Sequence, residues 1–266
     1  MLLGCNYSKE LIDLIRENKV DVDYIKLGLF DMYADVVEEA SSMRPILLHG
    51  FGYDEYIGMK NMKDIDWKRV NKYIVKFKTP HVGTHMLCKK DDWSSEASDE
   101  EILNFMMRNI ELWKSNINVP FLIENMPYSD YYSKKGLRKC YVDTNVINKI
   151  CEEKNVDVLL DVAHAKITAY CNEESIYDYL GKFPLNRIRE IHLAGTFKDK
   201  ETGLRDKHLE MEEEDYQILE WLLDRTNPEV ITLEYGGPGE HFANRSDKDA
   251  IERQLKRLMR ICNKNY

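Results

Sequence analysis

Eight short apolar runs that alternate with helical segments restrict the fold of this chain more than any other feature of its sequence. Each run has the length of a strand and is rich in Val, Ile, Leu or Phe, as the strands of a sheet buried on both faces are. The runs span residues 2–5, 24–28, 46–49, 81–85, 121–124, 158–161, 188–192 and 230–234. Strands that are joined by helical crossovers pair in parallel, so the sequence predicts a parallel sheet.

Helical periodicity and capping residues mark the segments between the runs. Ser98 is followed three residues later by Glu101, which is the pattern of a capping box and predicts a helix that starts there. The other predicted helices span residues 8–18, 31–41, 66–78, 143–154, 173–180 and 212–225. Ser246 is the predicted N-cap of a last helix, whose apolar stripe recurs at helical spacing at Ile251, Leu255, Leu258, Met259 and Cys262.

Eight such units can close into a (β/α)8 barrel, the TIM-barrel fold, which typically takes about 250 residues. The chain has 266 residues without a linker, internal repeat or low-complexity segment, so the sequence predicts one α/β barrel domain over residues 1–266. An open doubly wound sheet is the alternative, but no glycine-rich phosphate loop follows the first run. In a barrel, the loops after the strands build the active site.

Charge and cysteine usage exclude several classes of protein. Acidic residues outnumber basic ones by nine and the pI is about 5.4, whereas a nucleic-acid-binding protein usually has a basic surface. We therefore do not expect nucleic acid as the main partner. No run approaches the roughly 18 apolar residues of a membrane helix, and the N-terminus does not resemble a signal peptide. Six scattered cysteines without a CxxC pair suit a reducing compartment, so we expect a cytoplasmic protein.

Residues that ligate metals stand at the ends of six successive predicted strands and in the segments just after them. All are His, Asp or Glu, and five of the seven histidines of the chain are among them. Charged groups at the tips of apolar strands are costly unless they are paired or metal-bound. The sequence therefore predicts a metal site with nine ligands, which are His49, His85, Glu124, Asp161, His164, His192, Asp206, His208 and Glu234.

Nine nitrogen and oxygen ligands are too many for one ion, because about four to six usually serve one metal. Glu124 lies in the middle of the set and is predicted to bridge two ions, so we expect two or three ions. The ligand types suit iron, and equally zinc or manganese. Taken singly, each residue also has an ordinary role as a hydrogen-bonding or capping group. We interpret His81 as a core histidine or one that supports a ligand, and His241 as a surface residue.

Four of the predicted loops after the strands are long, and they span residues 50–65, 86–97, 125–142 and 194–211. The third loop is either a lid over the substrate or an ordinary solvated loop, and it contains Tyr128, Tyr131, Tyr132 and Tyr141. We expect two residues at its start, Asn125 and Tyr128, to bind substrate.

The nine residues and the strings around them resemble two related groups of enzymes. Their spacing is similar to that of the trinuclear site of endonuclease IV and its xylose-isomerase-like barrel relatives. The strings HGFG (49–52), LIEN (122–125), LLDVAH (159–164) and EIHLAG (190–195) are closer to the multinuclear non-heme iron-dependent oxidative enzymes, the MNIO family, over roughly residues 22–235. This chain has His164 where that family often has Asn, and Gly83-Thr84-His85-Met86 where it often has Ser-Glu-His-Leu.

The resemblance to the MNIO family implies three ions. The first would be held by His49, His85 and Glu124, the second by Glu124, Asp161, His192 and Glu234, and the third by His164, Asp206 and His208. It also implies an iron enzyme that oxidises a cysteine of a precursor peptide with dioxygen and works with a peptide-recognising partner protein. Two other functions stay open. One is a divalent-metal hydrolase or isomerase acting on phosphate or sugar substrates, and the other is a barrel that binds metal or ligand without catalysis.

Protein purified anaerobically from iron-replete cells is expected to contain two or three transition-metal ions per chain, measured by elemental analysis. Glu124→Ala is expected to lose more than one ion, because Glu124 is predicted to be a bridging ligand. A wild-type protein without any transition metal would contradict the predicted site.

Overall fold

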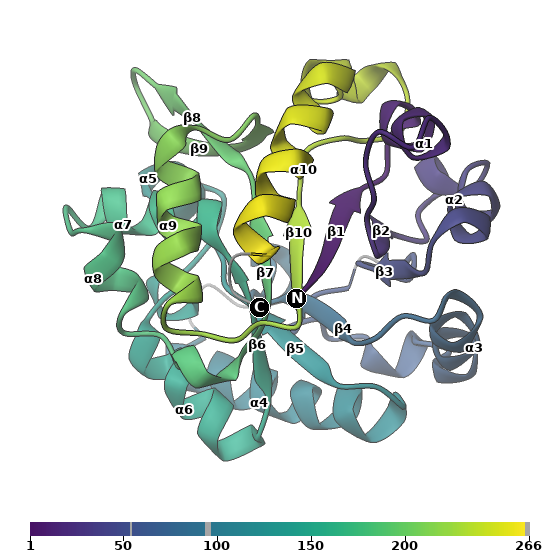
Figure 1. The fold of residues 1–266 in the computed structure, drawn as a ribbon. Coiled ribbons are helices and arrows are strands. Elements are labelled where there is room, and N and C mark those ends of the chain that lie inside the picture. Colours follow the sequence, from purple (N-terminus) through teal and green to yellow (C-terminus); the bar gives the residue numbers. More distant parts are fainter. Residues whose placement is uncertain (54, 94–96, 264–266) are drawn as a thin grey trace.

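The barrel predicted from the eight apolar runs is present in the structure, a computed structural model that describes residues 1–53, 55–93 and 97–263 (Figure 1). Its strands are β1 (Leu2–Asn6), β2 (Tyr24–Leu27), β3 (Ile46–Leu48), β4 (Val82–His85), β5 (Phe121–Glu124), β6 (Asp157–Asp161), β7 (Ile188–Leu193) and β10 (Val230–Leu233). They pair in parallel in the order β3-β2-β1-β10-β7-β6-β5-β4. The TIM-barrel prediction is confirmed, and every predicted run matches a strand to within one residue at each end.

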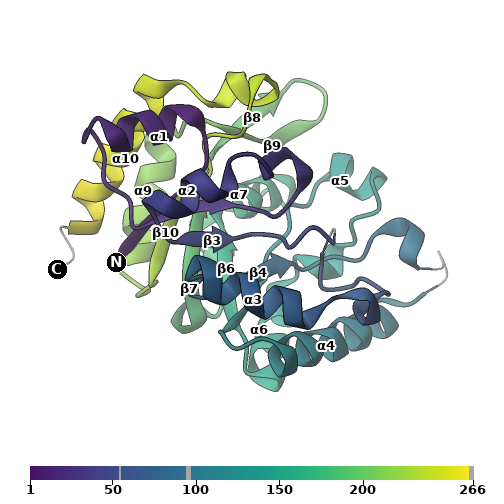
Figure 2. The same cartoon turned by 90° about the vertical axis from the view of Figure 1, so that its right-hand side faces the viewer.

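Helices cover the outside of the barrel and form a ring around the strands in Figure 1, and Figure 2 shows the same arrangement turned by 90°. They are α1 (Lys9–Arg16), α2 (Val37–Met43), α3 (Trp67–Phe77), α4 (Asp99–Asn116), α5 (Asp130–Lys134), α6 (Thr144–Lys154), α7 (Val162–Cys171), α8 (Ile176–Leu180), α9 (Glu213–Leu223) and α10 (Lys248–Asn263). Short 3-10 turns are η1 (Asp31–Tyr33), η2 (Met62–Asp64), η3 (Lys90–Asp92), η4 (Lys139–Tyr141), η5 (Leu185–Arg187) and η6 (Glu240–Arg245). None of the helices in the described part of the chain combines the length and apolar character that spanning a bilayer requires.

Of the two predicted N-caps, Ser98 and Ser246, the structure confirms the first. The Ser98 side chain accepts a hydrogen bond from the Glu101 N–H, and the Glu101 carboxylate accepts one from the Ser98 N–H, so the capping box at α4 is confirmed. The prediction that Ser246 caps the last helix is wrong. The Asp247 carboxylate accepts a hydrogen bond from the Ala250 N–H at 2.7 Å, while the Ser246 hydroxyl donates to the Phe242 carbonyl. Asp is as good an N-cap as Ser and lies one residue nearer the helix.

The structure also differs from the sequence prediction in other segments, and α5 lies within the predicted loop 125–142. The predicted helix 31–41 is divided between η1 and α2. The sequence does not predict α7, because residues 162–169 are all buried and no polar face alternates with an apolar one. The predicted loop 194–211 is instead an antiparallel hairpin of β8 (Gly195–Asp199) and β9 (Gly203–Leu209). Its strands are partly exposed and strongly charged, so they lack the apolar pattern of a core strand.

The barrel is not closed by a β3–β4 ladder, and the loop after β3 takes the place of that ladder. The N–H groups of Ile57 and Gly58 donate to the carbonyls of His85 and Leu87 at 3.0 and 2.8 Å. The buried Asn109 amide of α4 donates to the carbonyls of Ile57 and Met59 at 2.7 and 2.9 Å. A Cβ at Gly58 would lie 1.8 Å from the Cys88 sulfur, so only glycine allows this close approach.

We expect Asn109→Ala to lower the free energy of unfolding by about 1–3 kcal/mol, because it leaves two buried carbonyls without their donor. Urea unfolding followed by circular dichroism measures the change. The control is Asn104→Ala, on the exposed face of the same helix, which should change the free energy by less than about 0.5 kcal/mol. Equal effects of the two substitutions would show that the loop does not depend on Asn109.

Candidate metal centre

The nine predicted ligands meet at the carboxyl end of the barrel, because all eight parallel strands end at that face. Six come from the last two residues of a strand or from the residue just after it, and these are His49, His85, Glu124, Asp161, His192 and Glu234. Three come from the segments beyond, with His164 in the first turn of α7 and Asp206 and His208 on β9. A cavity of about 320 Å³ at this end is lined by seven of them, namely His49, His85, Glu124, His164, Asp206, His208 and Glu234.

Glu124 lies at the centre of the cluster. Its Oε2 is 3.4 Å from both His49 Nε2 and His85 Nε2, and its Oε1 is 3.6 Å from His192 Nδ1. The side chain is 2% exposed, yet Oε2 has no hydrogen-bond partner among the described residues. Two donors about 2.1 Å from one ion at a tetrahedral angle are about 3.4 Å apart. His49, His85 and Glu124 therefore have the spacing of ligands to a shared cation.

Two more three-ligand groups adjoin the first. Within each group, one donor atom per residue lies within 4.8 Å of the others. One group is Glu124, Asp161 and His164, and the other is Asp161, His192 and Glu234. Glu124 and Asp161 each belong to two groups, which is the arrangement that bridging carboxylates give.

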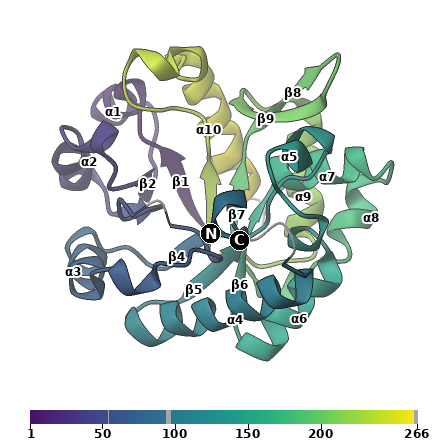
Figure 3. The same ribbon diagram turned by 180° about the vertical axis from the view of Figure 1, so that it is seen from behind.

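Asp206 and His208 lie on β9 and approach the cluster from the β8–β9 hairpin, the element labelled β8 and β9 in Figure 3. The Asp206 Oδ2 lies 3.1 Å from His208 Nε2 and 3.5 Å from His164 Nε2. His208 has a φ of 47°, a left-handed conformation that is uncommon outside glycine. Such strain persists only where the surroundings over-determine it, and it is frequent at ligand sites.

Three of the histidines have one ring nitrogen directed at the cluster and the other beside an oxygen acceptor that is not a proposed metal donor. His164 Nδ1 lies 2.8 Å from the Asn125 carbonyl, and His208 Nδ1 lies 3.1 Å from the Glu234 carbonyl. His192 Nε2 lies 3.1 Å from the Glu190 carboxylate. A ring N–H that donates to such an acceptor leaves the other nitrogen unprotonated and available to a metal.

Glu190 is a functional residue that the sequence analysis missed. Its carboxylate contacts His192, accepts a hydrogen bond from the Thr232 hydroxyl at 2.5 Å, and lies 2.5 Å from His81 Nε2. His81 is therefore buried below the ligands and supports one of them through Glu190, as interpreted from its position. The sequence does contain a pattern that indicates this role. Glu190 precedes the predicted ligand His192 by two residues, so the two side chains lie on the same face of the strand.

Lys26 was also missed, because β2 contributes no predicted ligand. Its side chain is 5% exposed, forms an ion pair with Glu234 and lies 3.5 Å from His192 Nδ1. A lysine in the middle of an apolar strand is the sequence signal that could have revealed it, since lysine is almost never fully buried unless paired. Its ammonium balances part of the negative charge of the cluster.

The protonation preferences of the histidines divide the cluster into two parts. Burial lowers the pKa of His49 to about 3 and also lowers that of His85, so both rings are neutral near pH 7. Burial and Lys26 also lower the pKa of His192, but the carboxylates of Glu234 and Glu190 outweigh them and raise it to about 10. The neutral rings of His49 and His85 can bind a metal without losing a proton. Around His192 the carboxylates stabilise positive charge, which divalent ions would supply in place of protons.

The tyrosine-rich segment contacts the β8–β9 hairpin. The Tyr132 hydroxyl accepts a hydrogen bond from the Asp206 N–H at 3.0 Å, and the Arg205 guanidinium stacks over the Tyr131 ring at 3.9 Å. Tyr141 is buried. These contacts hold the segment against the β8–β9 hairpin, and its role as a substrate lid stays a prediction.

The two residues predicted to bind substrate have different surroundings. The Asn125 amide is buried, donates to the Asp161 carbonyl at 2.9 Å and accepts from the Asp161 N–H at 2.8 Å, so it positions a predicted ligand. Tyr128 is half-buried and lines a separate cavity. A direct contact of either residue with substrate stays a prediction. His241 is exposed, as interpreted.

The sequence of the chain is similar to one described enzyme family. A profile described as "RiPP precursor modification enzyme MbnB/TglH/ChrH" matches residues 3–244. A UPF0276 protein of Acaryochloris marina is 23% identical over 180 residues, which are 65% of this chain and 62% of that protein. The chain thus spans less than two thirds of the length of this relative. A UPF0276 protein of Shewanella sediminis is 19% identical over 221 residues, covering 77% of this chain and 76% of that protein.

Among solved structures, a xylose isomerase domain protein from Alicyclobacillus acidocaldarius matches 98% of this chain and 98% of its own, with a TM-score of 0.64 and 15% identity. Endonuclease IV from Thermus thermophilus matches 100% of both chains, with a TM-score of 0.58 and 14% identity. At these identities the likeness concerns the fold alone.

We expect Glu190→Gln to weaken metal binding by roughly 10- to 100-fold, because residues that orient a metal-ligating histidine have effects of that size. Apparent dissociation constants from competition with a chelator measure the change, and circular dichroism checks the fold. Glu229→Gln is the matched control, since Glu229 forms a partly exposed ion pair with Arg189 and lies just before β10, at the opposite end of that strand from the proposed ligand Glu234. An unchanged metal affinity in a folded Glu190→Gln protein would contradict the role of Glu190.

Proposed function

Since the chain belongs to the RiPP precursor modification enzymes of the MbnB/TglH/ChrH family, a part of the MNIO family, we propose that it is an iron-dependent oxidoreductase that modifies a cysteine of a precursor peptide with dioxygen. The proposal takes residues 1–266 as one barrel domain that acts in the cytoplasm with a peptide-recognising partner protein. The oxidative reaction on cysteine, the oxidant, the metal, the partner protein, the compartment and the domain extent are the parts of this proposal that go beyond the family.

The single observation that carries the proposal is the buried carboxylate of Glu124, whose Oε2 faces two neutral imidazoles without a hydrogen bond from the described residues. An ionised carboxylate buried in this way is costly unless a cation compensates it. His49, His85 and Glu124 would hold one iron. Glu124, Asp161, His192 and Glu234 would hold a second, and His164, Asp206 and His208 a third. When bound, iron would supply the electrons that reduce dioxygen and a centre that accepts a substrate thiolate, chemistry that no side chain offers.

The proposed ligands differ in exposure, and the more exposed ones are those that a substrate would reach first. His192 and Glu124 are almost fully buried, whereas the side chains of His49 and His85 are 23% and 34% exposed. The His208 side chain is 24% exposed, so a thiol that enters the cavity would meet His49, His85 and His208 before the buried ligands. Lys26 holds Glu234 by an ion pair, and Glu190 keeps the Nδ1 of His192 directed at the carboxylates.

The thiol that reacts would come from the substrate and not from this chain. None of the three-ligand groups among the described residues contains a cysteine. Five of the six cysteines are buried, and burial raises the pKa of each of these thiols, that of Cys151 to about 12. A protonated, buried thiol is a poor metal ligand and a poor nucleophile.

We expect the iron-loaded protein to convert a cysteine-containing precursor peptide into an oxidised product with consumption of dioxygen, followed by mass spectrometry and an oxygen electrode. The zinc-loaded protein should be inert, because zinc has no accessible redox step. Addition of the peptide should also shift the absorption band of the iron form, whereas a peptide with Ser in place of Cys should not.

Glu124→Gln should lower this activity by roughly 10- to 100-fold or more, while His241→Ala, a change at an exposed histidine, should leave it unchanged. The competing result is a zinc-loaded protein that cleaves abasic DNA or interconverts a sugar phosphate without oxygen, combined with an iron form that ignores thiols. That result would replace the proposed oxidoreductase with a hydrolase or isomerase.

A further inference from the structure

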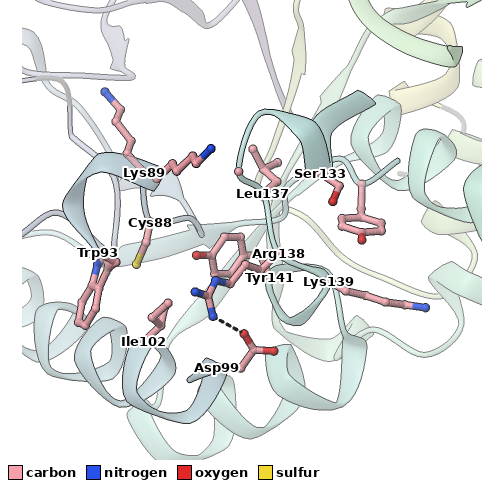
Figure 4. Close-up of a pocket in the computed structure, with 13 residues that line it drawn as sticks. Cys88, Lys89, Trp93, Asp99, Ile102, Ser133, Leu137, Arg138, Lys139 and Tyr141 are labelled. Carbon is pink, nitrogen blue, oxygen red and sulfur yellow. Dashed lines mark hydrogen bonds and ion pairs between the residues drawn. The ribbon is translucent and has the colours of Figure 1, made fainter. Parts of the chain in front are cut away.

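A second cavity lies at the same end of the barrel, between the loops that follow β4 and β5. Its volume is about 760 Å³, and Figure 4 shows the side chains around it. One wall runs from Cys88 to Trp93 and the other lies within residues 128–141, while Asp99 and Ile102 of α4 lie along its lower side in Figure 4. None of the nine proposed metal ligands is among its described lining residues, so it is separate from the metal centre.

Basic side chains dominate this cavity, although the net charge of the chain is −9. It is lined by Lys89, Lys90, Arg138 and Lys139, and Asp99 is the one carboxylate among the described lining residues. Asp99 is already paired with Arg138 at 2.8 Å, the contact drawn as a dashed line in Figure 4. In two other cavities, of about 580 and 520 Å³, carboxylates outnumber basic side chains. The positive charge is therefore a property of this cavity and not of the whole surface.

Two of the amines are available to an anionic ligand. Lys90 and Lys139 are exposed, and within residues 1–53, 55–93 and 97–263 neither forms an ion pair with a carboxylate. Arg138 is fixed instead, since its guanidinium donates to the Ala97 carbonyl at 2.7 Å as well as to Asp99. Lys139 extends away from Arg138 in Figure 4 and so lies at the rim of the cavity.

The cavity is also shaped by its backbone and its apolar lining. Gly136 has a φ of 96°, and a Cβ in its place would lie 2.8 Å from the Lys90 Cβ, so glycine lets the two walls approach. Trp93, Leu137 and Tyr141 provide an apolar surface beside the amines. A concave site with an apolar lining and a few charged groups is the usual form of a site that orients a ligand.

The distance between the two sites suits a short stretch of extended peptide. Cys88 follows the proposed ligand His85 by three residues, and Tyr128 follows Glu124 by four. Because an extended chain spans at most about 3.3–3.6 Å per residue, these positions are no more than about 11 and 14 Å from the ligands. A peptide segment of about three to five residues therefore reaches from this cavity to the metal centre.

We propose that this cavity binds acidic side chains, Asp or Glu, of the precursor peptide, about three to five residues from the cysteine that enters the metal centre. The inference rests on the proposed function, since it takes a peptide as the substrate. Lys90 and Lys139 supply the charge that recognises the carboxylates, and the fixed Arg138 and the apolar walls hold the adjoining peptide.

The test uses a fluorescent synthetic peptide with one cysteine and two glutamates four residues before it, and the same peptide with glutamines. Fluorescence anisotropy with the full-length, metal-loaded protein should give roughly fivefold tighter binding of the glutamate peptide at low salt. Lys90→Glu/Lys139→Glu should abolish that preference. Lys68→Glu/Lys72→Glu, which makes the same charge change on exposed positions of α3, should retain it.

A benzophenone placed beside the glutamates should cross-link to residues 86–93 or 128–141, as mapped by mass spectrometry. Equal binding of the two peptides to the wild-type protein, or an unchanged preference in Lys90→Glu/Lys139→Glu, would overturn the inference even if the cysteine is oxidised. Glutamate-dependent binding without oxidation would support this site and count against the proposed function alone. A single-stranded oligonucleotide that outcompetes the peptide through Lys90 and Lys139 would overturn the inference, because the cavity would then recognise phosphate.

Discussion

Buried carboxylates at the carboxyl end of the barrel are the constraint on which the rest of the structure depends. Glu124, Asp161, Glu190 and Glu234 are each at most 5% exposed, and a charge removed from water costs several kcal/mol unless it is compensated. The chain itself provides Lys26 and a set of imidazoles as compensation. The groups that would hold ions are therefore the groups that need positive charge, and occupancy of the centre by cations is coupled to the stability of the barrel.

The part of the site that the sequence predicts is the part that barrel topology dictates. A residue such as Glu124 ends an apolar run, parallel strands end at one face, and its neighbour His85 must then lie beside it, as the register of β4 with β5 shows. Asp206 and His208, on the β8–β9 hairpin, were predicted only from their residue types and their spacing. Asp206 and His208 do reach the cluster, but from strand β9 and not from the loop that the charged sequence suggested.

The residues that the sequence did not reveal act through contacts between strands that are distant in the chain. Lys26 on β2 meets Glu234 after β10, and His81 before β4 meets Glu190 on β7. No local pattern carries such a pairing, because each side chain alone is one polar residue within an apolar run. The helix α7 was hidden for the opposite reason, since burial on all sides removes the periodicity that identifies a surface helix.

The β8–β9 hairpin forms a two-stranded sheet of its own, yet it carries two of the three residues proposed for one ion. It is held at the mouth from outside, by the Tyr132 hydroxyl on the Asp206 backbone and by Arg205 on Tyr131. Binding of the third proposed ion would thus depend on an element that is separate from the barrel sheet. Exchange of this appended hairpin would alter the nuclearity of the proposed centre while the strands that carry the other ligands stay the same, so the inorganic chemistry of such a barrel could change without remodelling of its frame.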